Sequence, residues 1–282
     1  MKLIRLTCGL GNQMFIYAFY IQMKKRFPAI KLDISSMGKQ AAKNSNYEIA
    51  RIFHLKPDEY YVSKQLKKIM TSLFFKKVRE KFYIPYSPKN YICNYCWPFV
   101  YYKGFFQSEK FFLEATDKVR DVFSFDEKII NKKTRACLRQ IVVSESSVSI
   151  HIRRGDYLYS EVERRFGGIC TLEYYQKAIK LISESINNPV FFIFSDDINW
   201  VKEKLPLNNA TYTDWNSGND SWQDMFLMSR CQHNIIANST FSWWAAWLNT
   251  NRNKIVIAPE RWFQDMETPN IHPEKSGWIL IK

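Results

Sequence analysis

SVSIHIRRGD, residues 147–156, joins a predicted β-strand to a charged turn. The strand covers residues 147–152, and the chain then turns at Arg153, Arg154, Gly155 and Asp156. Downstream, predicted helices at residues 171–186, 198–205, 220–231 and 241–248 alternate with predicted strands at residues 190–194, 210–213, 234–237 and 254–258. This alternation indicates βαβ units and a parallel sheet that helices cover on both faces.

The first half of the chain begins with the same pattern. A predicted strand at residues 2–6, a glycine-rich turn, a helix at residues 13–26 and a strand at residues 30–34 follow one another. Helical patterns return at residues 111–123 and 126–142, whereas residues 36–105 are basic, aromatic and without a clear period. We therefore predict an α/β protein with two Rossmann-like domains, residues 1–144 and 145–282.

Composition limits the class of protein. The chain has 282 residues, of which 46% are hydrophobic and 24% charged, as in globular rather than disordered proteins. No apolar run reaches the roughly 18 residues that cross a bilayer. Arg5 and the glycines also interrupt any apolar core of a signal peptide. We expect a cytoplasmic protein and leave peripheral attachment to the inner face of the cytoplasmic membrane open.

The positive charge is concentrated in the first half. Residues 1–144 carry 27 basic and 11 acidic groups, whereas residues 145–282 carry 14 and 16. This asymmetry indicates an anionic partner for the first domain. The segment KQLKKIMTSLFFKKVREK, residues 64–81, has apolar residues at helical spacing between lysines. It fits either a core-facing helix with a solvated lysine face or a helix that lies on an anionic membrane.

The cysteines give no metal site. The chain has six, and the one Cys-x-x-Cys pair, Cys93 and Cys96, lacks a second pair to complete four zinc ligands. We predict buried free thiols and no bound metal.

The turn at Gly9, Leu10, Gly11 and Asn12 is the first candidate binding element. Glycines between a strand and a helix allow positive φ and let backbone N–H groups approach a ligand. Met14 occupies the third glycine position of the dinucleotide fingerprint. A tight packing turn and a ligand-binding turn therefore both fit.

Two more candidates follow predicted strands. Arg153 and Arg154 offer forked donors for phosphate oxygens, and because neighbouring extended residues point in opposite directions we expect one to reach a ligand and the other to pair with Asp156. A solvated surface turn is the alternative. In Phe194-Ser195-Asp196-Asp197, one carboxylate can cap the next helix and the other can accept hydrogen bonds from a nucleobase or ribose.

The fourth candidate is the segment Asn238-Ser239-Thr240-Phe241, where a predicted strand meets a helix N-terminus. Hydroxyls and free N–H groups at this position can hold a phosphate or simply cap the helix. Three of the four candidates follow strands of one domain, and ligands of open α/β sheets bind outside the carboxyl ends of the strands. A nucleotide diphosphate between two domains fits this arrangement.

At these residues the sequence resembles the bacterial α-1,2-fucosyltransferases, a family that includes the animal H-antigen enzymes. The matching segments are GLGNQMF at 9–15, HIRRGDY at 151–157, FSDD at 194–197 and IIANSTFSWW at 235–244. The His-x-Arg-Arg-x-Asp element is shared with α-1,6- and protein O-fucosyltransferases, and the last segment narrows the match to α-1,2. Cys8, where the family often has glycine, and Ile16, often glutamine, are departures that bear on fine specificity.

The resemblance implies two facing domains of the GT-B type, GDP-β-L-fucose as donor, a galactoside as acceptor, inversion at the transferred carbon and no divalent metal. It assigns Arg153 to the β-phosphate and Arg154 to its orientation. The nucleotide-lining residues that it implies are His151, Asp196, Asn238, Ser239, Thr240 and Phe241. Gly9, Gly11 and Asn12 would face the sugar phosphate from the other domain.

Inversion in one step requires a base on the acceptor hydroxyl. Asp156 and Glu161 are the acids nearest to the arginines in sequence, and the offset of Glu161 resembles that of a catalytic acid in the α-1,6 relatives. Both residues equally fit surface salt bridges with Arg153, Arg154 or Arg164.

Three other functions remain open from the sequence: a nucleic-acid-binding protein, a non-catalytic sugar-nucleotide or glycan-binding module, and a fucosyltransferase of another linkage. The basic first half favours a nucleic-acid-binding protein, but the sequence has no helix-turn-helix, zinc finger or RNP pattern. We therefore expect that nucleic acid is not a partner. The sequence does not identify the acceptor. We expect residues 36–105 to determine which acceptor the protein selects. We expect an acceptor that ends in galactose, with a lipid carrier as one option.

Overall fold

The structure, a computed structural model, describes residues 1–37, 47–60, 72–79, 97–158, 160–265, 271–273 and 277–282, with the backbone alone at residues 156 and 160–162. The chain divides into two compact units, whose main segments are Met1–Asp126 in unit 1 and Glu127–Thr268 in unit 2. The division lies ahead of the expected 144/145 boundary because helix α6 (Lys132–Val143) packs on α10 (Trp222–Arg230) of unit 2. The backbone N–H of Asn131, which caps α6, donates to the side chain of Gln223 at 2.8 Å.

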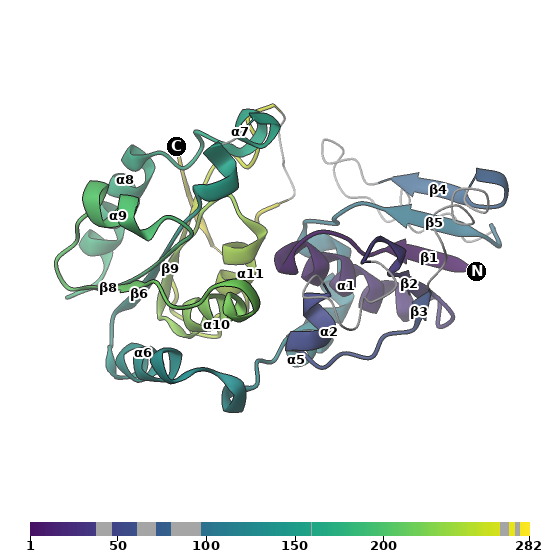
Figure 1. Cartoon of the computed structure of the whole chain (residues 1–282), viewed down its shortest axis with the longest axis horizontal. Coiled ribbons are helices and arrows are strands. Elements are labelled where there is room, and N and C mark those ends of the chain that lie inside the picture. The colour runs from purple at the N-terminus through teal and green to yellow at the C-terminus, as the bar shows by residue number, and fades with distance from the viewer. Residues whose placement is uncertain (38–46, 61–71, 80–96, 159, 266–270, 274–276) are drawn as a thin grey trace. The chain divides into compact units, whose positions relative to one another are not determined.

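Unit 1 contains a five-stranded parallel sheet in the order β3-β2-β1-β5-β4 (Figure 1). Its strands are β1 (Lys2–Arg5), β2 (Lys31–Asp33), β3 (Glu59–Tyr60), β4 (Lys76–Arg79) and β5 (Val100–Lys103). Its helices are α1 (Leu10–Lys24), α2 (Glu48–Ile52) and α5 (Thr116–Val122), with short 3-10 turns η1 (Ser35–Met37), η3 (Glu109–Phe111) and η4 (Leu113–Ala115). The predicted β1, α1 and β2 are confirmed, and the predicted helix at residues 111–123 consists of η3, η4 and α5.

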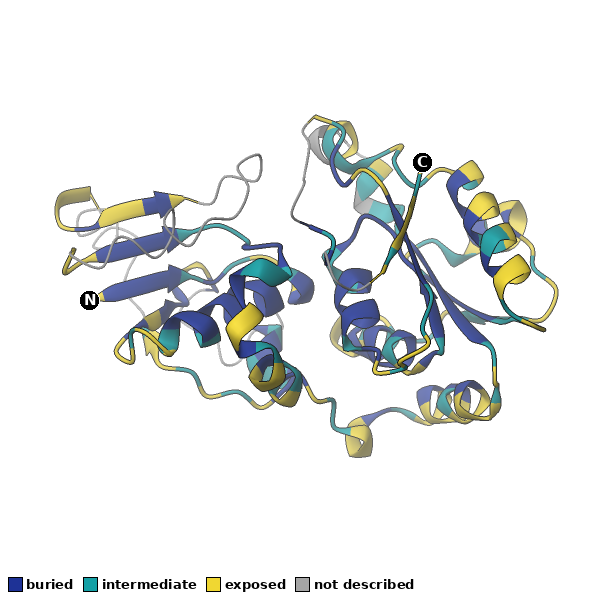
Figure 2. Ribbon diagram, turned by 180° about the vertical axis from the view of Figure 1, so that it is seen from behind, coloured by how far each residue is buried: buried dark blue, intermediate teal, exposed yellow. Residues whose placement is uncertain are grey.

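Helix α1 forms the centre of unit 1 and is buried along almost its whole length (Figure 2). Aromatic side chains surround it. Phe19 stacks on Phe106 with ring centroids 4.0 Å apart and meets Tyr102 and Phe111 edge-on. The high aromatic content of the chain therefore serves packing here, since stacked and edge-on ring pairs add stability beyond their buried area.

The amphipathic helix predicted over residues 64–81 is wrong in its described part. Residues 72–73 are helical, but the chain turns at Phe74 and forms strand β4, which pairs with β5 in parallel. Phe75 and Val78 are buried against this sheet. The reason is that strand pairing overrides a local helical period. Residues 64–71 and 80–81, and the Cys93–Cys96 pair, lie outside the described residues.

Unit 2 contains a six-stranded parallel sheet in the order β11-β10-β9-β6-β7-β8. Its strands are β6 (Ser147–Ile152), β7 (Val190–Ser195), β8 (Ala210–Thr213), β9 (His233–Ile235), β10 (Val256–Pro259) and β11 (Ile279–Ile281). Besides α6 and α10, its helices are α7 (Ser160–Phe166), α8 (Leu172–Ser185), α9 (Ile198–Lys204) and α11 (Thr240–Leu248), with 3-10 turns η5 (Glu127–Ile129), η6 (Gly155–Leu158) and η7 (Gly218–Asp220). The predicted strand and helix order is confirmed, whereas α7 and β11 were not predicted.

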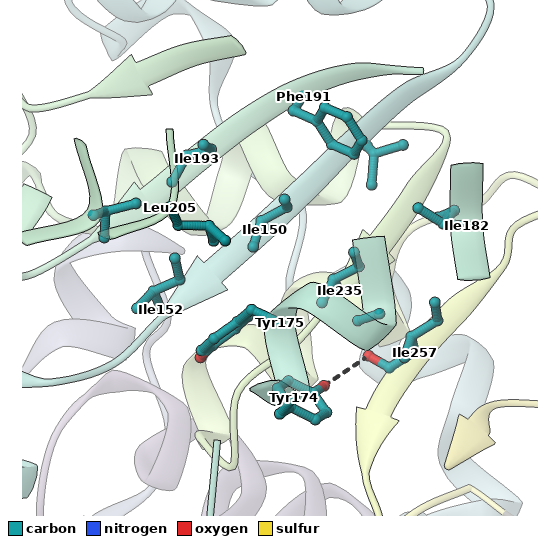
Figure 3. Close-up of a cluster of buried hydrophobic side chains, with 13 residues drawn as sticks. Ile150, Ile152, Tyr174, Tyr175, Ile182, Phe191, Ile193, Leu205, Ile235 and Ile257 are labelled. Atoms are coloured by element: carbon teal, nitrogen blue, oxygen red, sulfur yellow. Dashed lines mark hydrogen bonds between the residues drawn. The ribbon is translucent and has the colours of Figure 1, made fainter. Parts of the chain in front are cut away.

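The helices cover both faces of this sheet, with α8 and α9 on one side and α10 and α11 on the other (Figure 1). Figure 3 shows the core under α8, where Tyr174, Tyr175 and Ile182 pack on the apolar face of β6, β7 and β9. The Tyr174 hydroxyl donates to the carbonyl of Ile236 at 2.6 Å, so this large ring is buried without losing its polar partner. No helix in the described part of the chain is both long and apolar enough to span a bilayer. The prediction of two α/β units with parallel sheets is confirmed.

Candidate functional site

Strands β6, β7 and β9 lie side by side in unit 2, and each ends in polar residues. Arg153 follows β6, Asp196 follows β7, and Asn238 comes shortly after β9. Since all three strands are parallel, their carboxyl ends meet at one edge of the sheet. The structure thus brings together the candidates that are far apart in the sequence.

Arg153 and Asp196 form an ion pair at this edge, with Nη1 and Oδ2 3.0 Å apart. The other oxygen of Asp196 accepts the backbone N–H of Arg154 at 2.9 Å. Gly155 leaves room for this contact, because a Cβ at its position would lie 2.6 Å from Asp196 Oδ2 and the carboxylate would have to shift. Asp196 therefore fixes both the turn and the guanidinium of Arg153.

Arg154 points into a different set of contacts. Its Nε donates to Asp197 Oδ2 at 3.2 Å, and its guanidinium lies 3.7 Å from the centroid of the Trp200 ring. Asp197 also caps α9 by accepting the N–H of Trp200. Of the two carboxylates, Asp197 is thus the cap, and it is also a partner of Arg154. The expected pairing of an arginine with Asp156 involves a side chain outside the described part of the structure and stays a prediction.

His151 lies in the interior behind the arginines. Burial, followed by the positive charge of Arg153, lowers the pKa of its imidazole to about 4. The ring is therefore neutral near pH 7. Its Nδ1 has no hydrogen-bond partner among the described residues, and its ring centroid lies 5.7 Å from that of Phe241.

The N-terminus of α11 supplies the remaining candidates. Ser239 is the N-cap, and its hydroxyl accepts the N–H of Phe241. Thr240 is the first residue of the helix and is partly exposed. Free N–H groups at such an end favour an anion.

Asn238 has a structural role. Its side chain is 2% exposed and donates to the carbonyls of Phe166 and Trp262. The thiol of Cys170 donates to its Oδ1 at 3.5 Å. Asn238 thus ties together three loops at the sheet edge and positions the α11 turn. Whether it also touches a ligand stays a prediction.

A cavity of about 220 Å³ opens beside the arginines. Arg153, Arg154, Tyr157 and Trp200 line it, together with backbone at Gly167 and Gly168. Tyr157 places its ring near Arg153 and donates its hydroxyl to the carbonyl of Asn238 at 3.0 Å. Sequence reasoning missed the roles of Gly155 and Trp200. The position of Gly155 within the Arg-Arg-Gly-Asp turn could have indicated its role. No sequence pattern indicated the role of Trp200.

In unit 1 the glycine-rich turn is built differently from the expectation. Cys8, not a glycine, takes the left-handed backbone, with φ of 67°, whereas Gly9 is extended and forms the N-cap of α1. Gly11 is buried inside α1. Asn12 accepts a hydrogen bond from the side chain of Gln107 at 2.6 Å. The positive φ sits at Cys8, where the resembled family often has glycine.

Gln13 holds this turn to helix α2. The amide nitrogen of Gln13 donates to the carbonyl of Cys8 at 2.7 Å, and its oxygen accepts the N–H of Ile49 at 3.3 Å. Gln13 is fully buried. The start of α2 is therefore fixed beside the turn.

For the two candidate bases predicted from the sequence, the structure describes only the backbone. Asp156 lies in η6 and Glu161 in α7, and their side chains are outside the described part of the structure. The prediction of buried thiols is confirmed for Cys137 and Cys231, whereas Cys8 is exposed.

Comparison with known proteins places the chain in a family. The glycosyl transferase family 11 pattern matches residues 2–282. Alpha-1,2-colitosyltransferase of Escherichia coli is 33% identical and aligns with 99% of this chain and 98% of its own length. O-antigen biosynthesis glycosyltransferase WbnK of Escherichia coli is 33% identical, with 92% of this chain and 93% of that protein covered. Human galactoside alpha-(1,2)-fucosyltransferase 1 is 28% identical over 54% of this chain and 43% of its own length.

These matches confirm the resemblance on which the site was predicted. The alignments with the two bacterial proteins cover both units of the chain. The similarity therefore includes both the glycine-rich turn and the arginine cluster. The chain belongs to glycosyl transferase family 11.

Proposed function

We propose that this glycosyltransferase moves L-fucose from GDP-β-L-fucose to the 2-hydroxyl of a terminal β-galactose, with inversion at the anomeric carbon. The observation that carries the proposal is Arg153 at the cavity of unit 2, where it lies near the ring of Tyr157. Tyr157 in turn donates its hydroxyl to the carbonyl of Asn238, two residues before α11 begins. A guanidinium fork and a helix N-terminus are two donors suited to a diphosphate. The family match supplies the class of reaction.

In the proposed reaction, the leaving group is GDP. Negative charge develops on the β-phosphate as the bond between its oxygen and C1 of fucose breaks. Arg153 and the N–H groups of α11 stabilise this charge, which is the role that a divalent metal has in other glycosyltransferases. The neutral imidazole of His151 and the carboxylate of Asp196 contact the nucleoside part.

The names of the relatives support the proposed acceptor. One bacterial relative is named for O-antigen biosynthesis, and the human relative acts on galactosides with α-1,2 linkage. We therefore place the acceptor galactose in a unit of a bacterial surface polysaccharide.

Colitose transfer is the second candidate, because a relative that aligns over almost the whole chain is an α-1,2-colitosyltransferase. Colitose is fucose without the 3-hydroxyl. A site that hydrogen-bonds that hydroxyl rejects the deoxy sugar by a factor of about 10⁴, whereas an apolar pocket discriminates weakly. The rates of transfer from GDP-fucose and from GDP-colitose therefore distinguish the two candidate functions.

A donor competition decides between them. The protein is incubated with a galactose-terminated acceptor and equal concentrations of GDP-fucose and GDP-colitose, and the products are resolved by mass. The proposal expects predominant fucosyl product. Predominant colitosyl product supports the second candidate, and binding of GDP-fucose without turnover would leave a non-catalytic module.

We propose that the protein is located at an anionic membrane surface, to which it attaches peripherally. Leu73, Phe74 and Trp97 are exposed by 70%, 64% and 53%, and exposed Lys76 and Lys77 adjoin them on β4. Apolar side chains next to lysines suit the headgroup region, with each lysine contributing about 1 kcal/mol. Flotation should require anionic vesicles and fall when Lys76 and Lys77 become Glu, but not when the exposed pair Lys132 and Lys133 does. Equal flotation on neutral vesicles would contradict this location.

A further inference from the structure

The cavity of about 220 Å³ in unit 2 has apolar walls that a phosphate contact alone does not use. Apolar and aromatic side chains contribute much of its lining, among them Ile152, Leu158, Phe166, Leu172 and Tyr175. Pockets that enclose a whole drug-sized ligand measure roughly 300–1,000 Å³. The cavity is therefore sized for a single ring rather than for a complete nucleotide sugar.

The guanidinium of Arg154 lies at this cavity and is held there by two neighbours. Its Nε donates to Asp197 Oδ2 at 3.2 Å, and its Cζ lies 3.7 Å from the centroid of the Trp200 ring. Its two terminal nitrogens donate to no residue in the described part of the chain. A guanidinium that is held in place and still has N–H groups to donate is prepared for a ligand.

The tyrosine hydroxyls at the cavity already have partners. Tyr175 donates to the carbonyl of His151 at 3.1 Å, and Tyr157 donates to the carbonyl of Asn238 at 3.0 Å. The two tyrosines therefore serve the cavity as ring walls, whereas Arg154 retains donors that a ligand can use.

The sugar of the donor lies next to the phosphate that the proposed reaction assigns to Arg153, because C1 is bonded to an oxygen of that phosphate. Arg153 also lines the cavity, so a sugar on this phosphate can enter it within unit 2. Fucose and colitose carry a C6 methyl group beside their hydroxyls, and both parts suit a pocket with apolar walls and a few polar groups. A phosphate inside the cavity would instead place its charge against apolar side chains, which is costly.

We infer that this cavity is the subsite for the transferred 6-deoxy sugar and that Arg154 donates hydrogen bonds to its hydroxyl groups. The C6 methyl group packs against the apolar side chains of Ile152 and Leu172. The inference rests on the proposed function, because it takes Arg153 as the partner of the β-phosphate. It departs from the resemblance, which gave Arg154 a part in orienting that phosphate. It applies equally to fucose and colitose, since both lack the 6-hydroxyl.

The test compares binding of GDP with binding of the complete donor. Arg154→Met keeps a long side chain beside Trp200 but has no N–H group to donate. Isothermal titration calorimetry without acceptor gives the Kd for GDP and for GDP-fucose, or for GDP-colitose if that is the donor which wild type accepts. We expect the variant to bind the nucleotide sugar at least tenfold more weakly and GDP less than twofold more weakly, because only the sugar reaches the cavity.

Leu172→Phe is a second variant, which fills the cavity and leaves the contact between Arg154 and Asp197 in place. It should weaken binding of the nucleotide sugar at least tenfold and leave the Kd for GDP within twofold. Arg139→Met is the matched control, since Arg139 is exposed on α6 and does not line the cavity. It should change neither Kd by more than twofold. Far-UV circular dichroism establishes that each variant is folded.

Two outcomes overturn the inference. If Arg154→Met weakens GDP and the nucleotide sugar equally, Arg154 acts on the diphosphate. If it weakens neither, Arg154 does not contact the donor. If Arg154→Met does not fold, Leu172→Phe decides: a selective loss of sugar-nucleotide binding supports the subsite, and unchanged binding contradicts it. A wild type that binds GDP-fucose but transfers no sugar contradicts the proposed function and not the subsite, so the two failures are distinct.

Discussion

Arg153 and Asp196 are joined by an ion pair of 3.0 Å at the carboxyl ends of neighbouring strands β6 and β7. The resemblance assigned the arginine to the phosphate and the aspartate to the nucleoside. Their contact means that one carboxylate orients the cation for the leaving group. It also means that substitutions at either residue disturb the other.

Arg153→Ala should lower kcat at least 100-fold while the fold persists, because a donor for the developing phosphate charge is lost. Arg153→Lys should recover little, since an ammonium cannot make the forked contact. Steady-state kinetics and far-UV circular dichroism check this. Near-normal turnover by a folded Arg153→Ala variant would contradict the role of Arg153 at the β-phosphate.

Gly155→Ala should displace the carboxylate of Asp196, because the new Cβ would lie 2.6 Å from Oδ2. The expected loss in kcat/KM is about tenfold, and Gly155→Ala combined with Asp196→Ala should lose little more than Asp196→Ala alone. Residues in direct contact are non-additive in this sense. Fully additive losses in the double-mutant cycle would contradict the contact.

Stability should depend on pH through Asp224. Burial raises the pKa of its carboxyl to about 7, against the opposing hydrogen bond from Asn216. The unfolded carboxyl has a pKa of about 3.9 and so binds fewer protons between pH 4 and 7. The contribution of Asp224 to the free energy of unfolding is therefore greatest at about pH 4 and falls until about pH 7.

Asp224→Asn should remove this dependence. The variant should be more stable than wild type at pH 7.5, by about 1–3 kcal/mol, and should lose that advantage at pH 5. His151 acts with the opposite sign, because its lowered pKa favours folding as pH rises from about 4 to 6.5. Its contribution is common to both proteins and cancels in the difference. A difference in Tm that stays constant from pH 5 to 7.5 would contradict the shifted carboxyl.

Transfer should persist in excess EDTA, because arginine and helix N–H groups carry the phosphate charge in the proposed reaction. Initial rates with and without chelator, after prior dialysis, measure this. A loss of tenfold or more that magnesium or manganese restores would show that the reaction depends on a metal.

The sequence predicted the arginine cluster well because β6, β7 and β9 have local patterns. An apolar strand followed by polar residues reveals its carboxyl end, and parallel order then brings Arg153, Asp196 and Asn238 together. The N-terminal turn was placed correctly, but its positive φ falls on Cys8 rather than on glycine.

Unit 1 was harder because its strands lack a period. Tyr101 and Tyr102 of β5 are both fully buried, so no alternation of polar and apolar residues marks the strand. The helix predicted over residues 64–81 rested on apolar residues ahead of β4, whereas residues 76–79 pair with β5 as a strand. The link between the glycine-rich turn and α2 could not be predicted either, since the hydrogen bond from the N–H of Ile49 to Gln13 joins residues 36 positions apart.

The central claim is the chemistry of the product. GDP-β-L-fucose and a β-galactoside acceptor are incubated with the protein, and the linkage is assigned by NMR. The account predicts an α-L-fucosyl residue on O2 of galactose. A β-anomer, a linkage to another hydroxyl, or transfer of colitose with no transfer of fucose would contradict it.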